Sequence, residues 1–177
     1  MSTEENSPIH RYFAGIAENT FLIRLGVVDP PLIDYLTDML VRFVRNDSIH
    51  RIRSINGRPL LSVGEMALEA KERWGDARRE LHRHIGDFTL FWAGIYPEAL
   101  RRPAAGTEQF EEYCHQGKRS YHIASLIETV SNEAPPSSVL QNLSERFELC
   151  AYGLREVRRE WEEGDDETFG PGAILLN

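Results

Sequence analysis

Cysteine is scarce in this sequence, and long apolar runs are lacking. The two cysteines, Cys114 and Cys150, are too few for a disulfide scaffold and are not spaced as metal ligands. The most apolar run, from Phe88 to Tyr96, is far shorter than the roughly 20 residues that a membrane-spanning helix needs. The first residues (MSTEENSPIH) have neither the basic nor the apolar part of a signal peptide. We therefore expect a cytoplasmic protein with free thiols and no membrane segment.

Positive charge is also in deficit. The chain has 20 Lys and Arg residues against 28 Asp and Glu residues, a net charge of −8, which argues against a generally basic nucleic-acid binder. Its 13 Gly and 9 Pro are too few for a fibrous or low-complexity chain. With 41% hydrophobic residues, the length of 177 residues suits one domain that has its own core. We assign residues 1–163 to this helical domain and residues 164–177 to a flexible, acidic, glycine-rich tail.

Helix signals dominate the sequence and predict an all-α, single-domain bundle of about five helices. Each predicted helix begins at a capping residue, a capping box or a capping residue followed by proline. These starts are Ser7-Pro8, Asp29-Pro30, Ser62-x-x-Glu65, Thr107 and Ser138-x-x-Gln141. Residues 47–62 have no clean period and contain Asn56-Gly57, so we expect a short hairpin or a loop there. Residues 97–107 are expected to be a connector.

The clearest pattern lies in the fifth predicted helix. Apolar side chains recur there at alternating steps of three and four, so they form a continuous seam on one face. The seam consists of Leu140, Leu143, Phe147, Cys150, Leu154, Val157 and Trp161. The third predicted helix runs from Ser62 to Pro97 and contains Gly75 and Gly86. Each glycine weakens the helix by about 1 kcal/mol relative to alanine, which favours a bend or break near one of them.

His84 is the first candidate for chemistry, because it lies between Leu81 and Phe88 on the apolar face of the third predicted helix. We interpret it as a buried histidine whose ring bonds to a neighbouring hydroxyl or carbonyl group. The alternative is a ligand-binding or proton-transfer group that Asp87 orients.

Small or polar residues occupy one face of the fourth predicted helix, at Tyr113, Gly117 and Ser120. Small side chains let a neighbouring backbone approach closely, which is the interpretation that we favour. The alternative is a void. Together with Tyr121 and His84, it would form a polar-lined pocket for a small ligand.

Glu112 and His115 have the Glu-x-x-His spacing of carboxylate-bridged di-iron bundles. Such a site needs a second Glu-x-x-His pair and two further glutamates, and no other Glu of the chain has His three residues later. We therefore predict no metal site and no cofactor.

A basic stripe lies along the fourth predicted helix, where steps of three and four place its members on one face. The stripe consists of His115, Lys118, Arg119 and His122. It could hold a phosphate or a carboxylate. We favour pairing with acidic neighbours, such as the side chains of the acidic fifth helix.

A second basic segment includes Arg42, Arg45, Arg51 and Arg53. It is the best nucleic-acid candidate in the chain, but it has no interleaved aromatic residues, no helix-turn-helix and no phosphate-binding loop. An interaction surface for an acidic segment of a partner protein explains it equally well.

Several stretches of the sequence resemble those of uncharacterised bacterial all-helical proteins. These stretches are RIRS (51–54), HIGDFTLF (84–91), GIYPE (94–98), GKRSY (117–121) and FELC (147–150). The resemblance covers most of the chain, from about Phe13 to Trp161. It implies one intact helical domain from a bacterium, and it brings no activity, cofactor or catalytic residue.

Three hypotheses about function follow. The first is a non-enzymatic cytoplasmic protein that binds another protein or itself, because the sequence offers no nucleophile–base pair and no complete metal set. The second is a small-molecule or metal-dependent activity in the bundle core, carried by His84, Tyr113, His115 and Tyr121. The third is a nucleic-acid-associated regulator that uses the arginines of residues 42–58.

Overall fold

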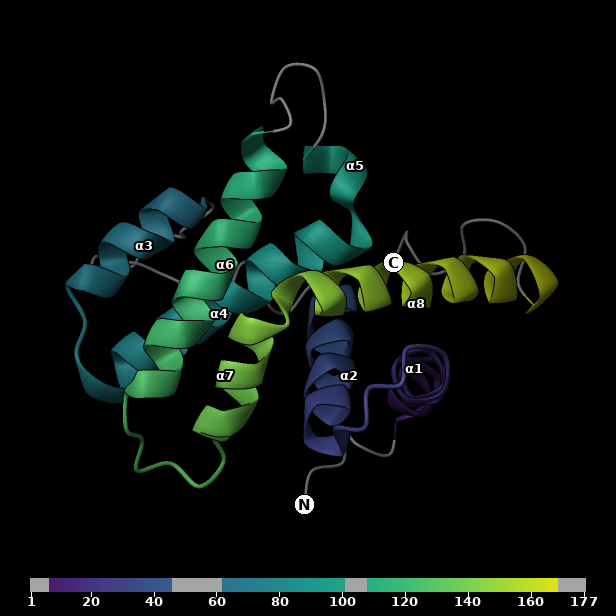
Figure 1. Cartoon of the computed structure of the whole chain (residues 1–177), viewed down its shortest axis with the longest axis horizontal. Coiled ribbons are helices and arrows are strands. Elements are labelled where there is room, and N and C mark those ends of the chain that lie inside the picture. Colours follow the sequence, from purple (N-terminus) through teal and green to yellow (C-terminus); the bar gives the residue numbers. More distant parts are fainter. Residues whose placement is uncertain (1–6, 46–61, 101–107, 169–177) are drawn as a thin grey trace.

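The computed structural model of the chain describes residues 7–45, 62–100 and 108–168, and every regular element in these ranges is a helix (Figure 1). The prediction of an all-α protein is confirmed. The elements are α1 (Pro8–Glu18), the π-helical turn η1 (Asn19–Arg24), α2 (Pro30–Val44), α3 (Val63–Lys71), α4 (Gly75–Ile95), α5 (Pro97–Leu100), α6 (Glu108–Leu126), α7 (Ser137–Glu145) and α8 (Phe147–Thr168).

Three of the predicted helix starts are confirmed by their capping bonds. The side chains of Ser7, Asp29 and Ser62 each accept a hydrogen bond from the backbone N–H three residues later, which satisfies a donor that the first turn leaves free. The prediction of a capping box at Ser138 and Gln141 is wrong. There, α7 begins after Pro136 without a side-chain cap, and Gln141 bonds instead to a glutamate one turn later.

Two of the predicted long helices are divided in the structure. The first division separates α3 from α4, where Gly75 has a φ of 54°, in the left-handed region that favours glycine. Gly86, by contrast, lies inside an unbroken α4. The second division falls at Arg146, between α7 and α8, so the prediction of one continuous fifth helix is wrong. α8 then continues through Gly164 to Thr168, beyond the end expected from the sequence.

The division at Arg146 leaves the predicted apolar seam intact. All seven seam residues are buried, and none is more than 4% exposed. The turn brings the Phe147 ring into the space where a Gly117 side chain would lie. The seam therefore reaches the core through two helices rather than through one.

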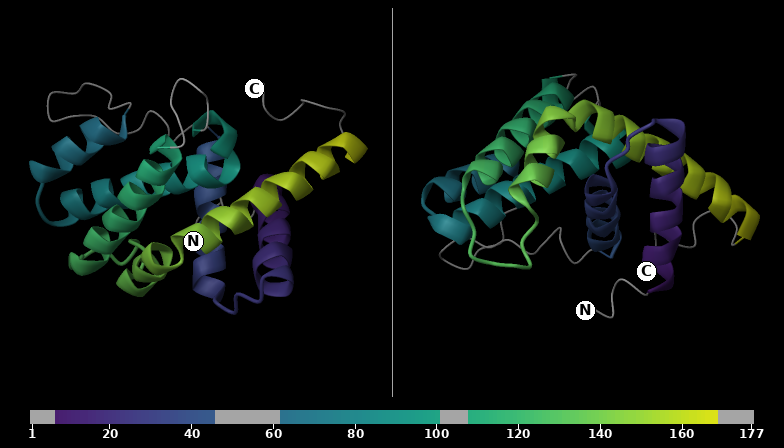
Figure 2. Two further views of the ribbon diagram at one scale, coloured as in Figure 1. Left: turned by 45° about the horizontal axis from the view of Figure 1, so that its top comes forward. Right: turned by 60° about the horizontal axis from the view of Figure 1, so that its bottom comes forward.

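The helices form two groups that share one core. α4 and α6 pack along each other, with α3 against α4 and α7 against α6. α1 and α2 pack on each other, and Figure 2 shows this pair on one side of the molecule, with the long α8 passing across both groups. Contacts between α2 and α4 are fewer, so the side chains that bridge these two helices help to hold the groups together.

Some predictions lie outside the described residues. These are the hairpin or loop at 47–62, most of which falls in the gap 46–61, the cap at Thr107, and the tail beyond Thr168. No helix in the described ranges combines the length and apolarity needed to cross a lipid bilayer. Cys114 and Cys150 are both free thiols, and burial raises the pKa of Cys150 to about 12.

Candidate functional site

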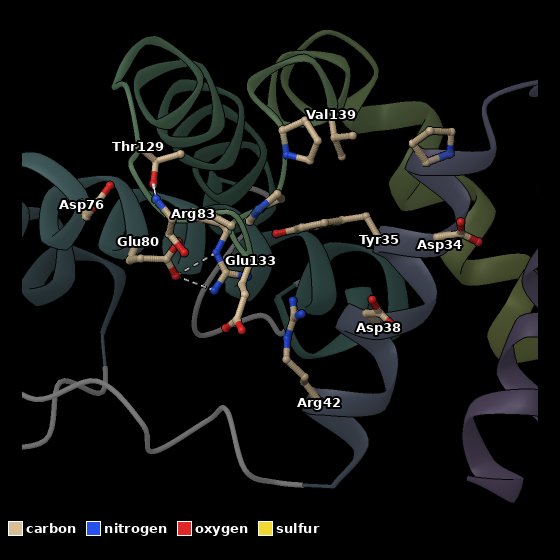
Figure 3. Close-up of a pocket in the computed structure, with 15 residues that line it drawn as sticks. Asp34, Tyr35, Asp38, Arg42, Asp76, Glu80, Arg83, Thr129, Glu133 and Val139 are labelled. Carbon is tan, nitrogen blue, oxygen red and sulfur yellow. Dashed lines mark hydrogen bonds and ion pairs between the residues drawn. The ribbon is translucent and has the colours of Figure 1, made fainter. Parts of the chain in front are cut away.

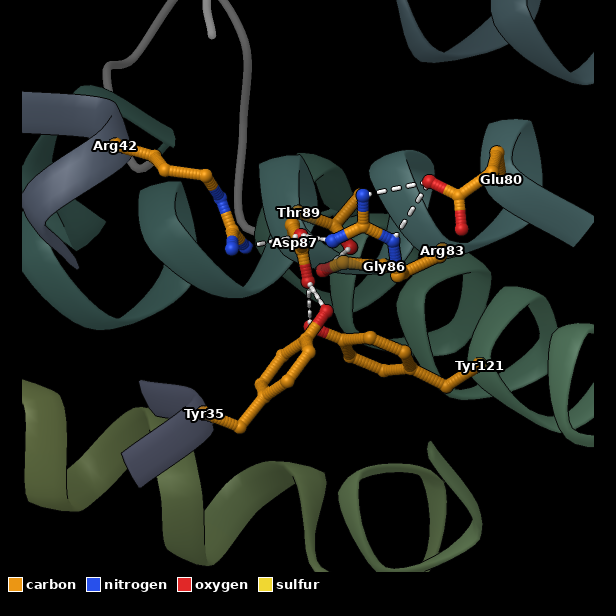
Figure 4. Close-up of polar contacts among 8 residues, drawn as sticks. All are labelled: Tyr35, Arg42, Glu80, Arg83, Gly86, Asp87, Thr89 and Tyr121. Atoms are coloured by element: carbon orange, nitrogen blue, oxygen red, sulfur yellow. Dashed lines mark hydrogen bonds and ion pairs between the residues drawn. The ribbon is translucent and has the colours of Figure 1, made fainter. Parts of the chain in front are cut away.

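Asp87 is a buried carboxylate that joins three helices (Figure 4). Its Oδ1 atom accepts hydrogen bonds from the hydroxyl groups of Tyr35 on α2 (2.5 Å) and Tyr121 on α6 (2.8 Å). Its Oδ2 atom accepts from Nη2 of Arg42 (3.0 Å) and, more weakly, from Nη1 of Arg83 (3.5 Å). We refer to these five residues as the Asp87 cluster. The Asp87 side chain is only 3% exposed, so these four donors supply the hydrogen bonds that solvent water would give to an exposed carboxylate.

The helical spacing of the sequence explains how the arginines reach this carboxylate. Glu80, Arg83 and Asp87 lie on one face of α4, at steps of three and four. Glu80 accepts two hydrogen bonds from Arg83, at 2.7 and 3.1 Å, and so orients the guanidinium. Arg42 comes from α2, two turns after Tyr35, and its guanidinium carbon lies 5.7 Å from the centre of the Tyr35 ring.

Tyr121 reaches Asp87 because α4 has no side chain at Gly86. A β-carbon at Gly86 would lie 2.6 Å from two ring carbons of Tyr121, which is closer than carbon atoms approach. Glycine therefore has a packing role at this position. It lets the ring lie across the α4 backbone with its hydroxyl group on the neighbouring carboxylate.

The electrostatics of the Asp87 cluster favour the protonated forms of Tyr35, Tyr121 and Arg83. Burial raises the pKa of Tyr35 and of Tyr121, and the negative charge of Asp87 raises both further. Burial acts to lower the pKa of Arg83, but the acidic groups beside it outweigh this effect and raise the pKa. The phenols therefore remain donors, and Asp87 accepts hydrogen bonds from all four of its neighbours in the cluster.

The Asp87 cluster forms one wall of an open cleft of about 600 Å³ between α2, the first half of α4 and the segment that joins α6 to α7 (Figure 3). Tyr35, Arg42 and Arg83 line the cleft, whereas Asp87 and Tyr121 lie behind them. Five carboxylates also line it, and we refer to it as the acidic cleft. They are Asp34, Asp38, Asp76, Glu80 and Glu133.

Negative charge dominates this cleft because its two arginines are already committed. Arg83 pairs with a carboxylate on each side, and Arg42 pairs with Asp87. Among the lining carboxylates, Oδ1 of Asp76 is buried without a hydrogen-bond partner, and Glu133 is exposed and forms no ion pair within the described ranges. The cleft therefore offers carboxylate oxygens to a positively charged group.

His84 is buried, as the sequence predicted, but it lies outside the Asp87 cluster. Its ring stacks on Phe43 with the ring centres 6.0 Å apart and lies 6.3 Å from the ring of Phe88. Asp87, which would orient this histidine under the alternative interpretation, instead accepts hydrogen bonds from the two tyrosines and two arginines described above.

The predicted pocket residues of α6 are separated in the structure. Tyr113 lines a second cavity, between α3 and α6. Ser120 is fully buried, and its hydroxyl group accepts a weak hydrogen bond from Gln116 (3.4 Å). The space beside Gly117 is filled by the Phe147 ring and a threonine of α4. Tyr121 alone of this predicted set belongs to the Asp87 cluster.

The predicted basic stripe on α6 is divided by an ion pair. Lys118 pairs with Glu148 of α8 at 2.8 Å, which is the kind of pairing that the acidic last helix predicted. His115, Arg119 and His122 are exposed on α6.

The second basic segment contributes one residue to the site. Arg42 belongs to the Asp87 cluster, and Arg45 is exposed at the end of α2. Arg51 and Arg53 lie outside the described residues.

Sequence reasoning missed Tyr35, Arg83 and the carboxylates of the α4 wall. A signal for that wall was present, because Asp76, Glu80, Arg83 and Asp87 recur at steps of four, three and four. Tyr35 gave no such signal, since its bonding partner is 52 residues away along the chain.

In the described ranges, no group of three or more His, Cys, Asp or Glu side chains is arranged to hold a metal ion. Glu112 and His115, the pair with di-iron spacing, are exposed on α6. Comparison of the chain with protein-family models, with curated proteins and with solved structures yields no match.

Proposed function

We propose that the protein is a non-enzymatic binding protein whose acidic cleft takes a positively charged segment of a partner protein. The observation that carries this proposal is the charge of the cleft, where five carboxylates face two arginines that are already paired with carboxylates. A lysine or arginine side chain would gain charge-assisted hydrogen bonds from oxygens such as those of Asp76 and Glu133.

The chemistry of the Asp87 cluster supports binding rather than catalysis. A general base needs a free acceptor, and Asp87 already accepts from two hydroxyl and two guanidinium groups. A tyrosine nucleophile or base needs a lowered pKa, whereas burial raises the pKa of Tyr35 and of Tyr121. The cluster is better suited to fixing the position of Arg42 and Arg83 at the cleft wall.

The form of the cleft favours a chain segment over a small enclosed ligand. Its lining includes the exposed residues Pro31, Asp38, Glu133 and Pro136, so one side is open to solvent. Small-molecule sites usually enclose most of the ligand surface and are mainly apolar. An open, charged cleft instead suits a side chain that projects from a partner.

The test is a binding titration with a fluorescent lysine- and arginine-rich peptide, compared with its glutamate-rich counterpart. We expect only the basic peptide to bind, with an affinity that falls as salt is added. Glu133→Gln and Asp76→Asn should each weaken binding about fivefold, which corresponds to about 1 kcal/mol.

The matched control is Glu163→Gln, which removes one exposed carboxylate from α8, outside the cleft. It should leave the affinity unchanged. Equal losses in the control and cleft variants would show a general charge effect and overturn the proposal. If a free diamine displaced the peptide completely, the ligand of the cleft would be a small cation, and the proposal of a partner segment would be overturned.

A further inference from the structure

The buried guanidinium group of Arg79 on α4 bonds at two points to the segment that joins α6 to α7. Its Nε atom donates to the carbonyl oxygen of Ile127 (3.1 Å), and its Nη2 atom donates to the carbonyl oxygen of Pro135 (2.6 Å). These carbonyl groups lie near the two ends of residues 127–136, which we refer to as the cleft segment. One side chain of α4 therefore holds both ends of the cleft segment.

The surroundings of Arg79 differ from those of the other arginine at this end of α4. Arg83, one turn later, pairs with two carboxylates of its own helix. Arg79 is 1% exposed, and in the ranges that the structure describes it forms no ion pair with a carboxylate. Its Nη1 atom is buried without a hydrogen-bond partner. A buried guanidinium group needs acceptors in place of water, and the two carbonyl groups of the cleft segment supply them.

The cleft segment forms one side of the acidic cleft (Figure 3). Six of its residues line the cleft: Thr129, Ser131, Glu133, Ala134, Pro135 and Pro136. The bonds from Ser131 N–H to Oγ1 of Thr129 (3.1 Å) and from Ala134 N–H to the Ser131 carbonyl group (3.4 Å) shape turns inside the segment. They do not attach it to α4, whereas the two bonds of Arg79 do.

We propose that Arg79 is a positioning residue of the acidic cleft. It lies between Asp76 and Glu80 on α4, and it holds the segment that carries Glu133, so carboxylates from both elements line one cleft before a partner binds. A site that is ordered in advance binds more tightly, because the partner does not have to order it. This inference rests on the proposed function of the cleft and adds the residue that fixes its binding conformation.

The test uses Arg79→Lys, which keeps the positive charge and the aliphatic stem but replaces the planar fork of donors by one ammonium group. Circular dichroism identifies a temperature at which the variant is folded. NMR relaxation of the backbone ¹⁵N nuclei then gives the order parameters of residues 129–134. We expect about 0.85 in wild type and less than about 0.6 in the variant. Wild-type values below about 0.6 would overturn the proposal without any variant.

Titration with the lysine- and arginine-rich peptide connects this order to binding. We expect Arg79→Lys to weaken binding about tenfold, or by about 1.4 kcal/mol. Because Arg79 acts through the placement of Glu133, adding Glu133→Gln to Arg79→Lys should cause little further loss, whereas independent roles would let the two losses multiply. If the wild-type protein binds no basic peptide, the proposed function fails, and the order parameters still test whether Arg79 holds the cleft segment.

The matched control is Arg158→Lys. Arg158 of α8 also donates to a backbone carbonyl group, that of Ile95, but it lies outside the cleft. The control should keep the wild-type order parameters in the cleft segment and the wild-type affinity. Equal losses in Arg158→Lys and Arg79→Lys would show general destabilisation and overturn the proposal. Unchanged order parameters in Arg79→Lys would also overturn it.

Discussion

The phenol ring of Tyr121 lies directly against the backbone of α4 at Gly86. A β-carbon at Gly86 would be 2.6 Å from the Cδ1 and Cε1 atoms of the ring. This contact lets α6 approach α4 closely and brings the Tyr121 hydroxyl group to 2.8 Å from the Asp87 carboxylate. The absence of a side chain at Gly86 thus allows the hydrogen bond between Tyr121 and Asp87. Asp87 in turn holds the arginines that line one wall of the acidic cleft.

Replacing Gly86 by alanine should therefore destabilise the protein. Alanine favours the helix by about 1 kcal/mol, but its methyl group would overlap the Tyr121 ring. Overpacking of this kind costs about 1–3 kcal/mol, and the loss of the Tyr121 hydrogen bond adds to it, so we expect a net decrease in the free energy of unfolding. Urea unfolding measures the change. Gly64→Ala is the matched control, because nothing lies within 4 Å of its β-carbon position, and it should be neutral or stabilising.

Asp87→Asn tests whether the buried carboxylate holds the two helix groups together. The amide keeps the shape but loses the charge that Arg42 and Arg83 share. We expect the free energy of unfolding to fall by about 3 kcal/mol, at the lower end for a broken buried pair, because the arginines are 30% and 20% exposed. Glu163→Gln breaks an exposed ion pair and should change the free energy of unfolding by less than about 0.5 kcal/mol. Similar small changes in both variants would contradict this role for Asp87.

Local features of the fold could be predicted from the sequence. The caps at Ser7, Asp29 and Ser62 depend on bonds that span three residues, and the apolar seam depends on a periodicity within one segment. The break at Arg146 could not be predicted in this way, because the seam keeps its spacing across the turn. Its position depends on the space that Gly117 leaves for Phe147, and this contact joins two different helices.

The candidate site was predictable only in part, for the same reason. Asp87 and Tyr121 were singled out by their places on helix faces, but their bond to each other spans 34 residues of sequence. Tyr35 joins them from 52 residues away, and no pattern near Tyr35 indicates its partner. His84 was favoured because it interrupts an apolar face, yet neighbouring aromatic rings account for its burial.

Phe147 provides a test of the core at the α7–α8 junction. Its ring is fully buried, lies over Gly117 and is 6.3 Å from the ring of Tyr121. Phe147→Ala should lower the free energy of unfolding by about 3–5 kcal/mol, because the change removes buried apolar surface and leaves a cavity. Leu149→Ala, at a position that is 38% exposed, should cost much less. A loss below about 1 kcal/mol for Phe147→Ala would show that the seam is not part of the core.

His82 should make the stability of the protein depend on pH. Burial, together with the charges of Arg78 and Arg119, lowers the pKa of this histidine to about 4 in the folded state. The unfolded value is about 6.5, so the unfolded chain takes up the proton first. The stability that neutral His82 contributes is therefore fully present above pH 6.5 and is lost as the pH falls toward 4.

Urea unfolding of wild type and His82→Gln between pH 4 and pH 8 measures this contribution. We expect the free energy of unfolding to decrease less on acidification in His82→Gln than in wild type. His115→Gln changes an exposed histidine of α6, and the free energy of unfolding of this variant should depend on pH as it does in wild type. Equal slopes in wild type and His82→Gln would mean that the folded protein binds a proton at His82 as readily as the unfolded chain does.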